Sequence, residues 1–243
     1  MASASWDIDA RPSGARAFLD LHCHTSASFD SLSDPVKVAR AAANRGLTHL
    51  AITDHDRIDG ALRARDAAPD GLTILVGQEV KTTDGDLIAV FIERPIALGL
   101  PARAAIEAVR EQGGLVGMPH PFDQFRGSLM RDARLVSLMP SVDWIEVHNA
   151  RLVGSGNEKA GEAARDHERP GVAVSDAHTI LEVGVAYSVL DGDPSTPAGL
   201  LAALPGAQLV TGRASYAVRL WTPLAKGIQR ARGNGRSRPA VGA

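Results

Sequence analysis

The chain has 243 residues, of which 44% are hydrophobic, so it can enclose one sizeable core, and barrels of this length are commonly one domain. A single cysteine excludes an internal disulfide framework, and neither a signal peptide nor an apolar run of transmembrane length is visible, so we expect a soluble cytoplasmic protein. The formal net charge is −2, but seven basic residues and no acidic ones follow Asp193, which leaves residues 1–193 with a charge of −9, suited to cation binding.

The first predicted strand covers residues 17–21 and ends in two histidines separated by one residue. Residues two apart in an extended chain point to the same side, so His22 and His24 can face one point in space, as the ligands of one metal ion do. Cys23 then points to the opposite side, and we expect it to pack in the core rather than to bind metal.

A helix is predicted after this strand. Asp34 is a good N-cap residue, Pro35 suits the first helical position, and Gly46 ends the helix. Residues 47–53 then form an apolar strand. Strand, helix and strand within about forty residues are typical of a parallel βαβ unit.

The same alternation continues to residue 210. We expect helices at 57–68, 101–112 and 157–168, and strands at 72–76, 87–92, 115–118, 142–147, 171–174, 185–189 and 208–210. The turn signal Asp84-Gly85 predicts a hairpin within this series. The pattern predicts a single-domain α/β barrel over residues 17–222, with an N-terminal extension at 1–16 and a basic, disordered tail at 223–243.

Ligand-type side chains lie at the ends of the predicted strands, which is the face where α/β barrels carry their chemistry. They are His22, His24, His55, Glu79, His120, Glu146, His148, Asp176 and His178. Imidazole with carboxylate suits Zn, Mn or Fe, and the near absence of thiolate argues against a Cys-rich structural zinc site. Asp176 and His178 repeat the spacing of the first pair, and Glu79 could bridge two cations. We therefore expect two or three divalent metal ions.

With these residues in place, the chain resembles the polymerase-and-histidinol-phosphatase (PHP) domain family of metal-dependent phosphoesterases. The matching motifs are Asp20-Leu21-His22-Cys23-His24-Thr25, Thr53-Asp54-His55-Asp56, Gly77-Gln78-Glu79, Pro119-His120-Pro121 and Ser175-Asp176-Ala177-His178. They span about three quarters of the chain, and as a set they are highly specific. The resemblance implies a distorted seven-stranded (β/α) barrel.

The resemblance also implies how up to three metals would be held. The first would be bound by His22, His24, Glu79 and Asp176, and the second by the bridging Glu79 together with His120. The third would be bound by Asp30, His55 and His178. The alternative for Asp30 is a loop acid or a helix cap without a ligand role.

Two positions stay open. Where many relatives place a histidine on the hairpin strand, this chain has Asp86, so either Asp86 substitutes as a ligand or the second metal is weakly held or absent. Glu146 alternates with His148 along a strand and so shares its face. His148 could bind metal or substrate, or could merely close the pocket.

The chemistry follows from the cations. A hydroxide that bridges two metals is a nucleophile at neutral pH and can attack phosphorus in line. Arg126 and Arg151 follow strand ends and could bind phosphoryl oxygens, although each could instead be a solvated loop residue or pair with Asp123 or Glu158. The leaving group would take a proton from Asp30, His148 or His178, and the sequence does not choose among them.

We therefore expect a metal-dependent phosphoesterase that hydrolyses a small phosphorylated metabolite or nucleotide. One alternative is a 3'-5' exonuclease or oligonucleotide phosphodiesterase, because the basic tail could contact the phosphates of a nucleic acid. Another is a metal-binding partner module without turnover. Substrate identity and oligomeric state are not encoded in any recognisable motif, and no membrane association is expected.

Overall fold

The computed structural model describes residues 16–123 and 133–235, and in them one sheet of nine strands. The strands are β1 (Arg16–Asp20), β2 (His49–Ile52), β3 (Thr73–Lys81), β4 (Asp86–Val90), β5 (Leu115–Met118), β6 (Trp144–Asn149), β7 (Gly171–Val174), β8 (Tyr187–Asp191) and β9 (Gln208–Val210). Their order in the sheet is β7-β6-β5-β4-β3-β2-β1-β8-β9. Neighbours are parallel from β1 to β3 and from β5 to β7, whereas β4 is antiparallel to β3 and β5.

The sheet curls into a nearly closed barrel, because β7 returns to the neighbourhood of β1 and β8. The hydroxyl of Ser188 on β8 accepts a hydrogen bond from Ala173 N at 2.9 Å and lies 3.2 Å from Ala173 O on β7. Beyond the strand ends, Cys23 forms a parallel bridge with Ala177. The predicted α/β barrel is confirmed, with β8 and β9 added to the seven strands that the resemblance implied, and β8 antiparallel to β1.

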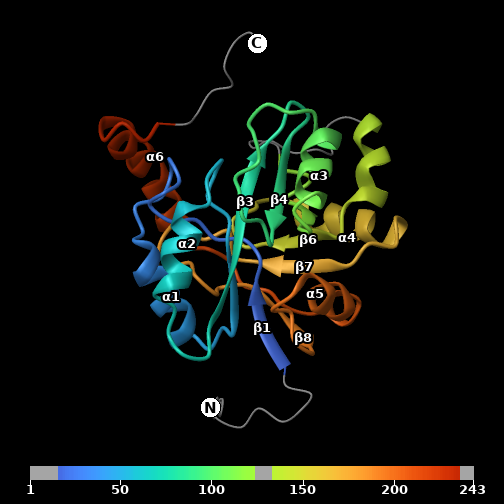
Figure 1. The fold of residues 1–243 in the computed structure, drawn as a ribbon, viewed down its shortest axis with the longest axis horizontal. Helices are drawn as coiled ribbons and strands as arrows, with labels where there is room; N and C mark the ends of the chain where they lie inside the picture. The colour runs from blue at the N-terminus through green and yellow to red at the C-terminus, as the bar shows by residue number, and fades with distance from the viewer. Residues whose placement is uncertain (1–15, 124–132, 236–243) are drawn as a thin grey trace.

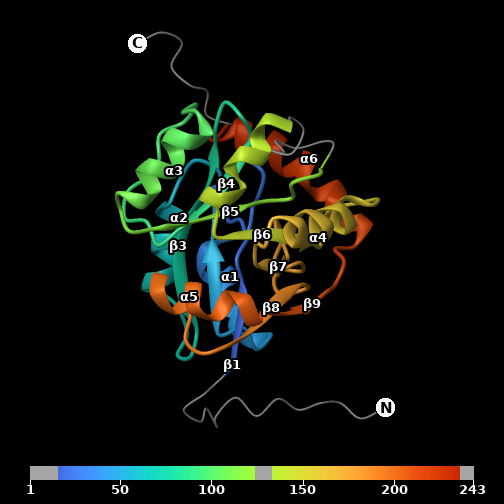
Figure 2. The same ribbon diagram turned by 90° about the vertical axis from the view of Figure 1, so that its right-hand side faces the viewer.

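Helices cover the outside of the barrel. They are α1 (Pro35–Asn44), α2 (Asp59–Asp66), α3 (Ala102–Arg110), α4 (Gly156–Asp166), α5 (Pro197–Ala203) and α6 (Tyr216–Ala231), with short 3-10 helices η2 (Ala133–Ser141) and η3 (Leu204–Gly206). Figure 1 shows α1 and α2 on one side of the sheet and α3 and α4 on the other. In this view and the perpendicular one, α5 lies near the end where β1 begins and α6 near the opposite end (Figure 2). No helix in the described ranges is both long and apolar enough to cross a membrane.

Local signals placed several of these elements correctly. Asp34 Oδ1 accepts hydrogen bonds from Val36 N and Lys37 N at 3.0 and 3.2 Å, which caps α1 as predicted, and Gly46 follows the helix with a φ of 80°. The hairpin at Asp84-Gly85 joins β3 and β4. The prediction of a disordered tail from residue 223 was wrong for residues 223–231, because they continue α6.

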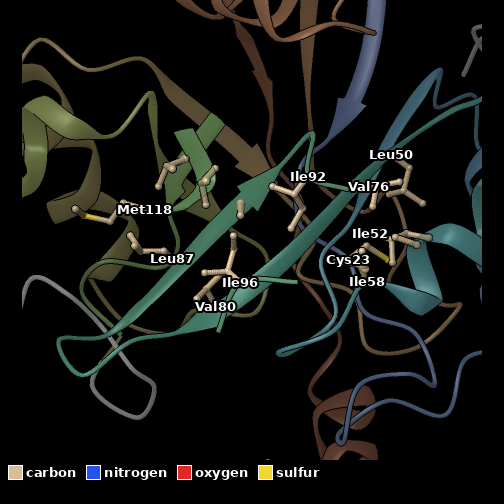
Figure 3. Packing of buried hydrophobic residues seen from close by; sticks show 14 of the residues in the cluster. Cys23, Leu50, Ile52, Ile58, Val76, Val80, Leu87, Ile92, Ile96 and Met118 are labelled. Atoms are coloured by element: carbon tan, nitrogen blue, oxygen red, sulfur yellow. The ribbon is translucent and has the colours of Figure 1, made fainter. Parts of the chain in front are cut away.

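Two apolar clusters build the core. One lies inside the barrel, since side chains from β1 to β8 meet in it, among them Leu19, Leu75, Ile88 and Trp144. The other lies between the sheet and the helices and is shown in Figure 3. Cys23 belongs to this outer cluster with Ile52 and Ile58, and it is fully buried, as the alternation with His22 and His24 predicted.

Candidate metal centre

The first group of ligand-type atoms lies at the barrel mouth and joins the ends of β1, β3 and β7. Nε2 of His22 and Nε2 of His24 are 3.0 Å apart, and each lies 3.3 Å from Oε2 of Glu79. Oδ1 of Asp176 lies 3.6 Å from the His22 nitrogen and 3.5 Å from the His24 nitrogen. We call His22, His24, Glu79 and Asp176 the first ligand group.

The other oxygen of Glu79 faces a different partner. Oε1 of Glu79 lies 3.3 Å from Nε2 of His120, which follows β5. One carboxylate therefore touches the first ligand group with one oxygen and His120 with the other. This is the geometry of a bridge between two neighbouring cation positions.

A second ligand group consists of Asp30, His55 and His178. Oδ2 of Asp30 lies 3.3 Å from Nε2 of His55 and 3.3 Å from Nε2 of His178. Nδ1 of His55 lies 3.2 Å from Oε2 of Glu79, so the two groups adjoin through this carboxylate. Atoms of His24 also lie within 4.8 Å of the second ligand group.

The donor set fits divalent cations. Two imidazole nitrogens face each other at 3.0 Å beside the carboxylate of Glu79, and all three side chains are buried, so only a proton or a metal ion between them removes the repulsion of their lone pairs. The described part of the chain contains two such clusters of histidine and acid. Nitrogen and oxygen ligands without thiolate suit Zn, Mn or Fe.

The pKa values of the buried histidines also fit a site that binds cations. Burial alone would lower the pKa of His55, but the charges of Glu79 and Asp30 outweigh it and raise the pKa to about 9. Burial opposes protonation of His22 too, yet Glu146 and Asp176 raise its pKa well above the usual value. Without a cation these rings would therefore hold protons, which a metal ion displaces when it binds.

His178 behaves differently within the second ligand group. Burial, together with the nearby charge of Arg151, lowers the pKa of His178 to about 3. Its ring is therefore neutral at pH 7 and keeps a nitrogen lone pair. Its Nε2 faces Asp30 and can accept a cation without first losing a proton.

Surrounding residues orient these side chains. Oε1 of Glu146 lies 2.6 Å from Nδ1 of His22, while its Oε2 accepts hydrogen bonds from His120 N at 3.0 Å and Asn149 Nδ2 at 2.9 Å. Asn149 Nδ2 also donates to Oδ2 of Asp176 at 3.1 Å. The sequence reasoning placed Glu146 on the correct face but missed Asn149.

The backbone is strained at two of the ligand-type positions. His120 has a φ of 29° and Asp176 a φ of 51°, in the left-handed region that non-glycine residues rarely adopt. Such conformations cost on the order of 1–3 kcal/mol and persist where the surroundings enforce them, often at functional sites. Both residues follow strand ends, where the strained backbone aims their side chains at the cluster.

The prediction that His148 shares the face of Glu146 was wrong. The pairing of β6 with β7 shifts register between these two residues, and this bulge turns His148 away from the site. Its Nε2 lies 2.7 Å from the carbonyl of Gly212 and its Nδ1 faces Asn157. Asn149 is the residue that the bulge directs inward.

Asp86 lies outside both ligand groups. Ile88 stands directly opposite Glu79 in the β3–β4 ladder, and Asp86 is opposite Lys81, closer to the turn. Its Oδ1 lies 3.3 Å from Lys81 Nζ. The structure therefore gives this carboxylate a cationic partner on the neighbouring strand.

Of the two arginines predicted to bind phosphoryl oxygens, the structure describes only one. Arg126 lies outside the described residues. Arg151 is buried, its Nε lies 3.1 Å from Oε1 of Glu182, and its Nη2 donates to Thr222 Oγ1 at 2.7 Å. Its acidic partner is therefore Glu182 and neither of the acids considered from the sequence. Glu182 also accepts a hydrogen bond from His178 N at 3.1 Å, so Arg151 lies close to the second ligand group.

Two family models match the chain: the PHP domain over residues 20–152 and the PHP-associated model over residues 154–208. An uncharacterized protein of Methanocaldococcus jannaschii is 31% identical over 173 residues, which cover 70% of this chain and 68% of the relative. A second uncharacterized protein of that organism is 33% identical over 142 residues, 54% of this chain and 81% of the relative. An error-prone DNA polymerase of Cutibacterium acnes is 34% identical over 46% of this chain but only 11% of the polymerase.

Solved structures share the fold. A two-domain protein of Bacteroides vulgatus that contains a predicted PHP-like metal-dependent phosphoesterase matches with a TM-score of 0.70 and 17% identity, over 84% of this chain and 68% of that one. The lesion-specific endonuclease Q of Pyrococcus furiosus matches with a TM-score of 0.62 and 18% identity, over 80% of this chain and 57% of that one.

Proposed function

Because this chain belongs to the PHP domain family, we propose that it is a metal-dependent phosphoesterase that hydrolyses a small phosphorylated metabolite or nucleotide. The observation that supports this most is the position of Glu79, which faces His22 and His24 with one oxygen and His120 with the other at the barrel mouth. We propose the first ligand group, the pair Glu79 and His120, and the second ligand group as three cation positions. Cations held there lower the pKa of coordinated water and neutralise charge on a phosphoryl group.

The chain's own residues then bind and orient the substrate. Arg151 is fixed by Glu182 and Thr222 beside the second ligand group, so its guanidinium can face a phosphoryl oxygen without losing further side-chain entropy. Of the three residues considered from the sequence as proton donors, Asp30 and His178 lie at the site, but as members of the second ligand group, and the neutral ring of His178 is a ligand rather than an acid at pH 7. His148 does not lie at the site, because its ring nitrogens face Gly212 and Asn157.

Hydrolysis of a generic aryl phosphate tests this proposal. We expect turnover by protein loaded with Mn or Zn, and loss of turnover after chelation and in His22→Ala. A matched control is His167→Ala, because His167 lies beyond α4 and away from both ligand groups. Metal-loaded protein that hydrolyses none of a broad panel of phosphomonoesters and phosphodiesters would overturn the proposal.

A second candidate is a nuclease that acts on oligonucleotides. Lys226, Arg230 and Arg232 are exposed on and just after α6, and Lys226 Nζ lies 5.4 Å from the ring of Phe29, which itself contacts His55. A basic surface next to the mouth favours a longer anionic substrate. Replacement of all three by serine should reduce oligonucleotide cleavage and its salt dependence while aryl phosphate turnover stays unchanged. Equal effects on both substrates would rule this candidate out.

A further inference from the structure

Helix α6 reaches the loop that carries Asp30. Gln229 is 3% exposed, and its Nε2 lies 2.8 Å from Ser26 O, 3.0 Å from Ser28 O and 2.7 Å from Ser31 O. One amide group thus gathers three backbone carbonyls of a single tight loop. The donor and the acceptors are about 200 residues apart in the sequence.

The end of the helix adds a second set of contacts to the same loop. Nδ2 of Asn234 donates to Ala27 O at 3.0 Å and lies 3.3 Å from Ser26 O. Lys226 stands over the ring of Phe29 in this loop. The outer side of this loop, residues 26–31, is therefore held against α6 and the residues that follow the helix.

The inner side of the same loop positions two members of the second ligand group, Asp30 and His178. Ser28 Oγ donates to Oδ1 of Asp30 at 2.7 Å, which leaves Oδ2 facing His55 and His178. Ser31 Oγ donates to the carbonyl of His178 at 2.8 Å. Any change in the curvature of the loop would therefore move Asp30 relative to both histidines.

The buried carbonyls make Gln229 difficult to replace. Ser28 and Ser31 are fully buried, and Asn234 Nδ2 lies 3.5 Å from Ser28 O, too far to replace the hydrogen bond from Gln229. Without the amide of Gln229 the two carbonyls would need closer donors, and the loop would shift to reach them. A shift on the order of 1 Å is enough to weaken coordination, because metal affinity depends on the orientation of each ligand. Asp30 is not part of the first ligand group, and this loop reaches that group through the weaker contact of 3.5 Å between Ser31 Oγ and the carbonyl of His24, so the first ligand group should be affected less.

We propose that Gln229 is a positioning residue for Asp30, and that docking of α6 sets the affinity of the second ligand group for a divalent cation. This inference rests on the proposed function to the extent that it takes the ligand groups to bind cations. It gives the basic C-terminal segment a role at the metal centre that does not depend on nucleic acid.

The test is a double-mutant cycle on cation binding. Stoichiometry and affinity for Mn and Zn are measured by calorimetry and elemental analysis on the full chain, for wild type, Gln229→Leu, Asp30→Asn and the double variant. We expect Gln229→Leu to weaken the binding of one cation about 10- to 100-fold and to affect the others much less. Because Gln229 acts through Asp30, it should have no further effect in the Asp30→Asn background. Leu224→Gln, at an exposed position on α6, is the matched control and should bind cations like wild type.

Two results would overturn the inference: Gln229→Leu that binds every cation like wild type, or an effect of Gln229→Leu that adds in full to that of Asp30→Asn. If Gln229→Leu does not fold, Asn234→Ala removes only the outer hydrogen bonds and should weaken the same cation by a smaller factor, whereas unchanged affinity counts against the proposal. Wild-type protein that binds cations but hydrolyses no phosphoester contradicts only the proposed function. Wild-type protein that binds no cation contradicts both.

Discussion

Glu146 Oε1 lies 2.6 Å from Nδ1 of His22, and both side chains are fully buried. This contact places a proton on Nδ1, so a cation that displaces the second proton of the ring would bind Nε2, which faces His24 and Glu79. The same carboxylate also accepts the backbone N–H of His120. Glu146 therefore connects His22 and His120, which belong to two of the proposed cation positions, and would orient both ligands from outside the ligand groups.

Replacement of Glu146 by glutamine should weaken cation binding. The amide keeps the size of the side chain but has only one acceptor atom, so it cannot accept from Nδ1 of His22 and from the N–H groups of His120 and Asn149 at the same time. We expect affinity for the most tightly bound cation to fall about 10- to 100-fold, as is typical when an outer carboxylate partner is lost. Competition with a chromogenic chelator measures this. Glu158→Gln, on the exposed face of α4, should change nothing, and equal affinities in both variants would show that Glu146 does not orient His22.

His148 and Asn149 are adjacent on β6, but their replacement by alanine should have different effects on cation affinity. His148→Ala loses a hydrogen bond to Gly212, so it should cost about 1 kcal/mol of stability and leave cation affinity and kcat within about twofold of wild type. Asn149→Ala removes the donor to two buried carboxylates, Glu146 and Asp176, and should reduce cation affinity tenfold or more. Kinetics and metal titration of the two variants measure the difference. A larger loss in His148→Ala would mean that the bulge does not turn this residue away in solution.

The sequence predicted most of the architecture, because the signals involved are local. Asp34-Pro35 starts α1, Asp84-Gly85 turns the hairpin, and alternating strands and helices indicate a barrel. Helix α6 was missed because Pro223 lies within it and its composition is basic, both of which are typical of a chain end. The position of α6 depends on residues far away in the sequence, since Gln229 donates hydrogen bonds to carbonyls just after the first strand.

Those residues of the candidate site that directly follow a strand could be predicted from the sequence. Histidines and acids that follow parallel strands must meet at one edge of the barrel, so His22 and Asp176 could be brought together from sequence. The register shift between Glu146 and His148 could not, because it arises from the pairing of β6 with β7 and leaves no pattern in β6 itself. Asn149 was missed for the same reason.

Asp86→Asn should keep the cation stoichiometry of wild type. Asp86 lies opposite Lys81, and its oxygen is 3.3 Å from Lys81 Nζ, so its charge already has a cationic partner, although it also helps to raise the pKa of His55. Elemental analysis after dialysis measures the stoichiometry, and His120→Asn serves as the comparison that should lose a cation. Loss of one cation from Asp86→Asn would instead identify this carboxylate as the ligand that replaces the expected histidine.

Gly117→Ala should destabilise the barrel. A Cβ at this position on β5 would overlap Cε2 of Trp144, which is fully buried inside the barrel. The indole cannot move without disturbing the closely packed interior, so we expect a loss on the order of 1–3 kcal/mol in urea unfolding. Gly227→Ala on α6 is the control, because nothing lies within 4 Å of its added Cβ, and it should be neutral or slightly stabilising. Equal midpoints for the two variants would contradict the packing described for β5 and β6.

Asp20→Asn should change how stability depends on pH. Burial raises the pKa of Asp20 to about 7 from an unfolded value near 3.8. A carboxyl whose folded pKa is raised contributes its full stability below about pH 4 and loses it as the pH rises through 7, on the order of 4 kcal/mol. Asparagine keeps the oxygen that accepts hydrogen bonds from His22 N and Ser175 N but cannot ionise. In urea unfolding of chelator-treated protein, the free energy of unfolding of the variant should therefore rise relative to that of wild type between pH 4 and 8. A constant difference across that range would show that Asp20 ionises normally in the folded protein.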